Sequence, residues 1–502
     1  MQHQHPPFLA MRTLFVVEPK MEWMQVQGRL IMLTHERPKG ATAMTMITGF
    51  ACVCLSIGGV VAQPASSESL PKGQAERVKV LTARLHPISQ EQGGGFLVDS
   101  EVSGLRDADL ADVAKIPGIR YLHDNGFGPS ARAQFGKLTE LEALSTSFAG
   151  YVTDEDLRCL QQLKLLEVLA LRSTVTRPEP LTSPGRSAPS FGAVSLKPLA
   201  RMSRLRELEL RSDGLSDEAL VHVGAVPELL SLTLEGHFTS DGLKSLSRLK
   251  SLRQLSLDGN FDDDGLVHLA QLTNLESVVL LSDRLTGTGL AHLSKLPKMR
   301  MCRLGRLKAT MTLAPLKNWP TLEALNLTDG SMTDVILLTL PRTNQIKSLS
   351  LHGAPVTDRG LVAISQLENL EELDLIFTAV TDDGLETVAS LPRLRALCLG
   401  EGGTKRLISE AGLRKLARLP VLERLDLRYV RLKDVDLQIL AIPSLTMLHI
   451  EDTSQVGSLR RLHDRLPRLA RRSSRVVIKA GLFNESNFSR YNIYANRMEV
   501  EW

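Results

Sequence analysis

A leucine pattern that returns every 23 or 24 residues constrains this 502-residue chain more than any other feature of its sequence. The clearest units start at Leu205, Leu229, Leu252, Leu275, Met299, Leu322, Ile346, Leu370, Leu394, Leu422 and Leu445; the unit from Leu394 is the exception, at 28 residues. Less regular units start near Ile119, Leu141 and Leu166. Because repeats of this length pack only on their neighbours, the period predicts one elongated stack of layers.

The unit that starts at Leu370 shows what one layer contains. Its sequence is LEELDLIFTAVTDDGLETVASLPR, in which Leu373 and Leu375 alternate with acidic residues. That alternation predicts a short strand with one buried face. From Leu385 onward the apolar residues recur every three positions, which fits the buried stripe of a short helix. Each unit is therefore expected to be a strand, a turn and a short helix.

The turn before each expected helix carries a hydroxyl residue followed by an acid. Examples are Thr153-Asp154, Ser216-Asp217, Thr333-Asp334, Thr357-Asp358 and Thr381-Asp382. A Ser or Thr at a helix N-cap can accept a bond from a free helix N–H, and acids in the first turn oppose the helix dipole. We interpret these carboxylates as caps. The run 262–264, three aspartates, falls in the same place and lacks the alternating oxygen ligands of a calcium-binding EF-hand loop.

The pattern LxxLxLxxxxVTDxGLxxLxxLxx resembles the leucine-rich-repeat superfamily, over roughly residues 96–469. It is most similar to the repeats in the substrate-binding part of F-box adaptor proteins and in many predicted exported bacterial proteins. The resemblance implies an α/β solenoid whose parallel strands line a concave face and whose short helices form the convex face. We place this solenoid at 96–470, with a Pro-, Ser- and Gly-rich loop insertion at 176–197.

The region before the repeats contains an uncharged apolar segment at 41–63. Arg37 and Lys39 precede it and Val60 and Ala62 close it, which is typical of a secretory signal. Its length also approaches the roughly 20 residues that span a bilayer, so a membrane anchor is an alternative, and a buried helix is a third. Residues 1–40 are interpreted as an unstructured or mis-assigned extension, 64–95 as a linker and 471–502 as a C-terminal cap or tail.

Side chains that alternate with the buried leucines should line the concave face and form any partner-binding surface. The least polar stretch is Val279, Leu281 and Met301, beside Arg303, and clustered exposed apolar side chains tend to mark contact sites. The charged residues expected to complete the surface are Glu372, Asp374, Arg424, Asp426 and Arg428. The same alternation places on this face Ile376, Ala396, Cys398 and Gly400. The alternative is that these outward positions are simply solvated.

Charge gives little indication of a nucleic-acid partner. The net charge is +4 with acids and bases interspersed, although eight basic residues and the single acid Asp464 lie in 460–479. Such a cluster can attract an anionic partner, but terminal repeats also need a polar cap, and we favour the cap.

The sequence contains no metalloprotease, Walker, Rossmann or nucleophile-elbow motif and no CxxC pair. We therefore expect no catalytic residues, no cofactor and no metal, and a monomer. The expected function is a non-catalytic protein–protein interaction scaffold, extracytoplasmic or membrane-anchored, or cytoplasmic if 41–63 is not a signal. The alternative is an F-box-like adaptor subunit of a ubiquitin ligase, for which the first ninety residues offer no convincing helical docking module.

Overall fold

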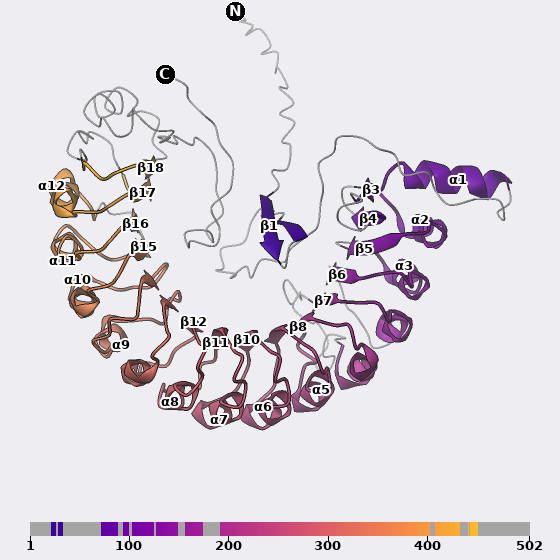
Figure 1. Ribbon diagram of the computed structural model, residues 1–502, viewed down its shortest axis with the longest axis horizontal. Helices are drawn as coiled ribbons and strands as arrows, with labels where there is room; N and C mark the ends of the chain where they lie inside the picture. Colours follow the sequence, from indigo (N-terminus) through magenta and orange to yellow (C-terminus); the bar gives the residue numbers. More distant parts are fainter. Residues whose placement is uncertain are drawn as a thin grey trace, which may run out of the picture.

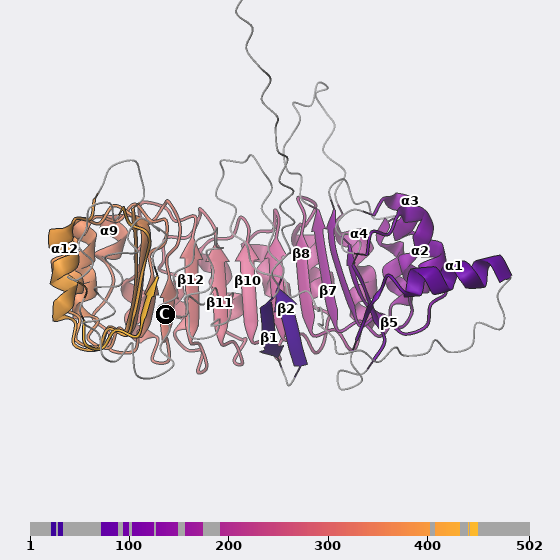
Figure 2. The ribbon, with the colours of Figure 1, turned by 90° about the horizontal axis from the view of Figure 1, so that it is seen from above.

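The computed structural model describes residues 22–26, 29–33, 72–88, 94–99, 103–124, 127–148, 156–173, 191–401, 407–431, 440 and 442–449. Its main body is one sheet of sixteen strands, arranged in sequence order from β3 to β18. The sheet curves into an arch in which the strands line the inner side and the helices the outer side (Figure 1). Seen from above, the strands stand side by side across the arch (Figure 2).

The strands from β4 to β18 pair in parallel, each with the strand of the next repeat, and β3 pairs with β4 in antiparallel fashion. Their bounds are β3 (His86–Pro87), β4 (Phe96–Asp99), β5 (Ile119–Asp124), β6 (Ala143–Phe148), β7 (Val168–Ser173), β8 (Glu207–Arg211), β9 (Ser231–Glu235), β10 (Gln254–Asp258), β11 (Ser277–Leu281), β12 (Met301–Gly305), β13 (Ala324–Asn326), β14 (Ser348–Ser350), β15 (Glu372–Thr378), β16 (Ala396–Glu401), β17 (Arg424–Tyr429) and β18 (Met447–His449).

Short helices return the chain from one strand to the next on the convex side. The α-helices are α1 (Lys72–Thr82), α2 (Asp107–Val113), α3 (Pro129–Arg132), α4 (Ala193–Leu196), α5 (Asp217–Val223), α6 (Ser240–Leu246), α7 (Leu266–Leu269), α8 (Leu290–Leu293), α9 (Asp334–Leu337), α10 (Asp358–Leu361), α11 (Gly384–Val388) and α12 (Glu410–Lys415). Several units use 3-10 helices as well or instead: η2 (Phe135–Lys137), η3 (Asp156–Gln162), η4 (Lys197–Arg201), η5 (Asp263–Gly265), η6 (Ala314–Asn318), η7 (Val362–Gln366) and η8 (Leu416–Arg418).

The repeating leucines form one continuous core between the strands and the helices. In the unit from Leu370, the strand residues Leu373 and Leu375 and the helix residues Leu385 and Val388 are all buried. The expected α/β solenoid with concave strands is therefore confirmed. Cys302, which occupies a leucine position, is fully buried, and burial raises the pKa of its thiol.

The hydroxyl–acid pairs of the turns connect neighbouring repeats, a role that the capping interpretation did not include. The Oδ1 and Oδ2 atoms of Asp334 accept bonds from the backbone N (2.8 Å) and Oγ1 (2.6 Å) of Thr357 in the next repeat. Thr357 also caps its own helix by accepting from the backbone N of Arg359 at 3.3 Å. The N-cap residues Ser216 and Thr333 make no such side-chain cap bond. The pair thus acts mainly as a clamp between layers.

A row of charged residues of alternating sign runs across the repeats just before the strands. It comprises Arg253, Glu276, Arg300, Glu323, Lys347, Glu371, Arg395 and Glu423. Within this row, Glu323 lies 3.7 Å from the Nε atom of Arg300 and 2.9 Å from the Nζ atom of Lys347. The Arg253–Glu276 and Arg395–Glu423 pairs belong to the same row. Each of these ion pairs joins two consecutive repeats, so the row stabilises the contacts between neighbouring layers.

Three segments outside the regular repeats differ from the sequence expectations. The segment 64–95, expected to be a linker, contains α1 and β3, which cover the first repeat. The α1 side chains of Val78 and Leu81 are buried, and the Arg77 guanidinium lies 3.0 Å from Asp109 of α2. The last part of the expected loop 176–197 forms α4, beside the buried Phe191. Residues 1–40 contain the antiparallel strands β1 (Glu22–Val26) and β2 (Arg29–Leu33). The segments 41–63 and 471–502 lie outside the described residues.

Candidate interaction surface on the concave face

The apolar residues that the sequence singled out lie together on two adjacent strands. Val279 and Leu281 are on β11, and Met301 and Arg303 are on β12, where Val279 pairs in register with Arg303 and Leu281 with Gly305. Met301 is 38% exposed, and the other three are partly buried. A Cβ atom at Gly305 would lie 2.8 Å from the Cδ2 atom of Leu281, so the Leu281 side chain leans over Gly305. We call these four residues the β11–β12 patch.

Small or polar side chains surround the β11–β12 patch on the neighbouring strands. They are Ser231, Thr233, Gln254 and Ser256 on one side and Ala324, Asn326, Ser348 and Ser350 on the other. Among them the guanidinium of Arg303 is partly withdrawn from water, and this loss of solvation lowers its pKa, against the opposing effect of Asp329. The patch therefore combines exposed apolar surface with a partly dehydrated positive charge, on a floor of small side chains.

Toward the N-terminal side, the concave charges are largely paired with one another. Glu209 is buried, and its Oε1 atom accepts bonds from the Nε atoms of Arg172 and Arg211, each at 2.6 Å. Arg211 also reaches Glu235 on the next strand at 3.1 Å. For Glu207, burial reduces the solvation of the carboxyl and raises its pKa.

The charged residues predicted on the later strands also form pairs within the chain. Glu372 on β15 is 7% exposed and lies 2.9 Å from the Arg424 guanidinium on β17. Asp426 is only 1% exposed and lies 3.5 Å from the Nδ1 atom of His449. Asp374 accepts a bond of 3.2 Å from the Oγ atom of Ser350. The backbone of Arg428 belongs to β17, and its side chain lies outside the described residues.

Four positions expected to face the open concavity are buried: Ile376, Ala396, Cys398 and Gly400. The last three belong to β16 and have small side chains or none, so longer side chains of β15 and β17 close over this strand. The ion pair of Glu372 and Arg424 joins the strands on either side of Ala396. A Cβ atom at Gly400 would lie 2.9 Å from the Cβ atom of Tyr429 and 3.1 Å from the Cγ2 atom of Ile376. The expectation of exposure was wrong there because of this cover.

An aromatic cluster at the same end of the sheet was missed from the sequence. The rings of His352 and Phe377 lie 5.3 Å apart, and those of Phe377 and Tyr429 lie 4.8 Å apart. Phe377 has a φ of 57°, and the pairing register shifts between Leu375 and Thr378. A non-glycine residue in this left-handed conformation is uncommon and marks a local rearrangement. The visible signal was the pair of consecutive apolar residues, Ile376 and Phe377, at the end of an alternating strand.

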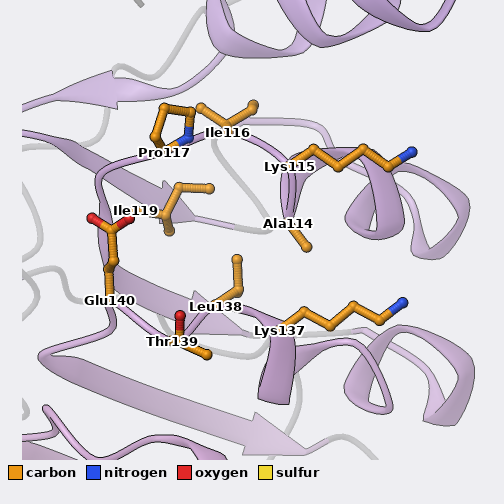
Figure 3. A pocket seen from close by; sticks show the side chains of 9 residues that line it. All are labelled: Ala114, Lys115, Ile116, Pro117, Ile119, Lys137, Leu138, Thr139 and Glu140. Carbon is orange, nitrogen blue, oxygen red and sulfur yellow. The ribbon is translucent and has the colours of Figure 1, made fainter. Parts of the chain in front are cut away.

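A cavity of about 250 Å³ lies on another part of the molecule, between the loops that lead into β5 and β6 (Figure 3). Its walls are residues 114–117, Ile119 and residues 137–140. The Lys115 and Lys137 side chains extend away from Ile119, and the Nζ atom of Lys115 donates to Asp112 at 2.6 Å. None of the predicted partner-binding residues lines this cavity.

Among the described residues, no three His, Cys, Asp or Glu side chains are grouped so that they could hold a metal ion. None of the described helices is long and apolar enough to cross a lipid bilayer.

No family model matches the sequence, and neither does any curated protein. Among solved structures, the chain is similar to an internalin, InlF, of Listeria monocytogenes, with 19% identity, a TM-score of 0.39 and coverage of 64% of this chain and 79% of the internalin. A leucine-rich-repeat protein of Leptospira interrogans has 15% identity and a TM-score of 0.40, covering 71% of this chain and 91% of its own. TLR13, solved in complex with ssRNA13, has 20% identity and a TM-score of 0.47, with 74% of this chain and 58% of TLR13 covered.

The 23- to 24-residue leucine period, the parallel strand that each unit contributes and the leucine core behind those strands show that the chain has a leucine-rich-repeat fold.

Proposed function

We propose that the chain is a non-catalytic interaction module that binds a partner protein on its concave face. The observation that carries this proposal is the β11–β12 patch, where the exposed Met301 and the partly buried Leu281 present apolar surface among small or polar side chains. Exposed apolar side chains gathered on one surface favour contact with another macromolecule. The partly dehydrated Arg303 adds a positive charge to this surface.

The experiment compares binding by the wild-type chain with binding by Leu281→Asp and by a matched control. Leu338→Asp is the control, since it introduces the same charge at an exposed leucine that follows α9 on the convex side. We expect a partner protein to bind the wild type and Leu338→Asp but not Leu281→Asp. All three chains should have the same melting temperature. Equal retention by all three chains would remove the β11–β12 patch as the binding surface.

We further propose that the module acts outside the cytoplasm, exported or tethered. This rests on the sequence of 41–63, with its basic flank and small closing residues. N-terminal sequencing of the protein from an extracytoplasmic fraction should then give a start near Gln63, or an intact chain that stays with the membrane if the segment is an anchor. An intact chain in the cytosolic fraction would contradict export. The adaptor alternative predicts instead that deletion of the gene slows the turnover of a protein that co-purifies with the chain.

A further inference from the structure

The side chain of Arg306 reaches back across the sheet to the strand before last. Arg306 directly follows β12, and its Nη1 atom donates a hydrogen bond to the Oδ1 atom of Asp258, the last residue of β10. Between these two strands lies β11, which ends at Leu281 (Figure 1). Asp258 pairs in register with Leu281. Leu281 pairs in turn with Gly305, the residue before Arg306. The ion pair of Arg306 and Asp258 therefore crosses the carboxyl end of β11 beside Leu281.

The backbone of Arg306 is held from the opposite direction. Arg306 has a φ of 56°, a left-handed conformation that residues other than glycine rarely adopt. Its backbone N donates to the Oδ2 atom of Asp329 in the next repeat, where the Oγ atom of Ser331 also accepts a bond of 2.7 Å from the backbone N of Leu307. A strained residue of this kind persists where its surroundings fix it. The turn is thus fixed, and the movable part of Arg306 is its side chain.

The contact between Arg306 and Asp258 is weak. The Arg306 side chain is 44% exposed and that of Asp258 is 25% exposed, and ion pairs that water reaches contribute little. Burial raises the pKa of the Asp258 carboxyl, and Asp329 adds to the rise. Together they outweigh the lowering of this pKa by Arg306 and Arg211. The pair therefore forms at the cost of part of the solvation of Asp258, and the Arg306 side chain can leave and return readily.

A single ion pair holds the Arg306 side chain in place. In the part of the chain that the structure describes, Asp258 is the one acid that forms an ion pair with Arg306. The nearby Arg211 is bound instead by Glu209 at 2.6 Å and Glu235 at 3.1 Å. Removal of either member of the Arg306–Asp258 pair should therefore release the Arg306 side chain.

Leu281 is the member of the β11–β12 patch that lies beside this ion pair. It is partly buried, and it leans over Gly305, where an added Cβ atom would lie 2.8 Å from its Cδ2 atom. Met301 begins β12, at the end of the strand away from Arg306, and is exposed. The two ends of the patch therefore differ in their access to solvent.

We propose that the Arg306 side chain is a movable strap that closes over the end of β11 and limits access to Leu281. With the strap bound to Asp258, the Met301 end of the β11–β12 patch is open and the Leu281 end is covered. Release of the strap makes the whole apolar surface accessible. Its importance for partner binding rests on the proposed function, but its opening can be measured without a partner.

The test measures, in the full chain, how fast a thiol placed under the strap reacts. Leu281→Cys introduces the thiol, and its labelling by iodoacetamide, a small neutral reagent, is followed by mass spectrometry of the peptide that contains position 281. Because the labelled peptide is identified, the five cysteines of the wild type do not interfere. Ser277→Cys is the matched control, since Ser277 begins the same strand, at the end away from Arg306.

Two substitutions of opposite charge separate release of the strap from a direct effect of charge. Arg306→Gln and Asp258→Asn, each combined with Leu281→Cys, should both speed labelling about two- to fivefold, as expected for loss of one exposed ion pair. A direct effect of charge would differ in sign between them. Loss of a positive neighbour raises the pKa of a thiol and slows labelling, whereas loss of a negative neighbour lowers this pKa and speeds labelling.

Arg306→Gly is a second way to remove the strap. Glycine adopts the left-handed turn without strain, so this variant should stay folded and give the same increase in labelling as Arg306→Gln. Ser277→Cys should be labelled at the same rate with and without each of these substitutions.

Three outcomes overturn the proposal. The first is labelling at position 281 that neither Arg306→Gln nor Asp258→Asn changes. The second is a change of opposite sign in these two variants, which would assign the effect to charge. The third is an equal increase for Ser277→Cys, which would show that β11 loosens as a whole. All three leave the proposed function standing, while a partner that still binds Leu281→Asp would contradict that function and leave the labelling result intact.

Discussion

The carboxylate of Asp358 holds Thr381 of the following repeat by two bonds, 2.8 Å to its backbone N and 2.6 Å to its Oγ1 atom. Asp358 also begins α10, so one side chain serves the start of its own helix and the turn of the next layer. Gly384 completes the contact, because a Cβ atom there would lie 2.2 Å from the Oδ1 atom of Asp358. The Thr, Asp and Gly of the repeat pattern are thus three parts of one contact between layers.

Gly384→Ala should destabilise the chain by about 1–3 kcal/mol, the usual cost of forcing an extra methyl group into a close-packed contact. The added Cβ displaces Asp358 from Thr381, so the cost includes weakened hydrogen bonds. Urea unfolding measures the effect. Gly330→Ala is the matched control, since a Cβ at Gly330 meets nothing within 4 Å and should change stability by less than about 0.5 kcal/mol. Equal effects of the two substitutions would contradict the packing role of Gly384.

Asp263 predicts a pH dependence of stability. Burial raises the pKa of its carboxyl, but bonds from Thr286, Gly287 and Gly289 to the charged form outweigh burial, and the net pKa is lowered. The folded pKa therefore lies below the unfolded value of about 3.9. The resulting stability is present above that unfolded value and is lost as the pH falls through the folded pKa.

Asp263→Asn should accordingly lower the urea midpoint at pH 7, and the gap from the wild type should shrink as the pH falls below about 4. Asp264→Asn, at the exposed neighbouring position, serves as the control and should change the midpoint little at any pH. A gap for Asp263→Asn that stays constant down to acid pH would show that its bonds do not favour the charged form.

Leu373→Ala should cost about 2–5 kcal/mol, because it removes a fully buried side chain and leaves a cavity in a layer. Val362→Ala removes apolar atoms from an exposed position on the convex side and should cost less than about 0.5 kcal/mol. Thermal melting of the two variants distinguishes them. Comparable losses would mean that the core is not organised around the leucine period.

Glu323→Lys should place three like charges in a row with Arg300 and Lys347, where two attractive pairs stand now. Exposed pairs contribute little singly, so we expect a loss of about 1 kcal/mol at low salt. Screening should relieve most of that loss at about 0.5 M salt. Melting temperatures of wild type and variant at both salt concentrations test this, and a difference that salt leaves unchanged would assign the effect to packing.

The sequence predicted the features that repeat and missed those that occur once. Leucine spacing was sufficient to predict the strands, the helices and the buried residues, because the leucines of every layer pack between a strand and a helix in the same way. Strand alternation also brought Val279, Leu281 and Met301 to neighbouring strands, where Met301 is exposed and the other two are partly buried; their role in binding stays a prediction.

The aromatic cluster of His352, Phe377 and Tyr429 was not predicted, for reasons that lie in particular residues. A prediction from strand alternation assumes that each residue pairs with one residue of the neighbouring strand. The left-handed Phe377 lies at a register shift, where β15 has one residue more than β16. The pairing of Glu372 with Arg424 skips a strand, which no local pattern indicates. The sequence also did not show that the Asp–Thr hydrogen bonds join consecutive repeats, because the same residues could instead cap their own helix.

The alternating row of charges from Arg253 to Glu423 limits which repeats the array can lose or duplicate. Excising the single layer that contains Glu323 would set Arg300 beside Lys347, two positive neighbours. Excising that layer together with the next would set Arg300 beside Glu371 and restore attraction. With respect to these charges, the smallest portion of the array that can be lost or duplicated without conflict is a pair of layers.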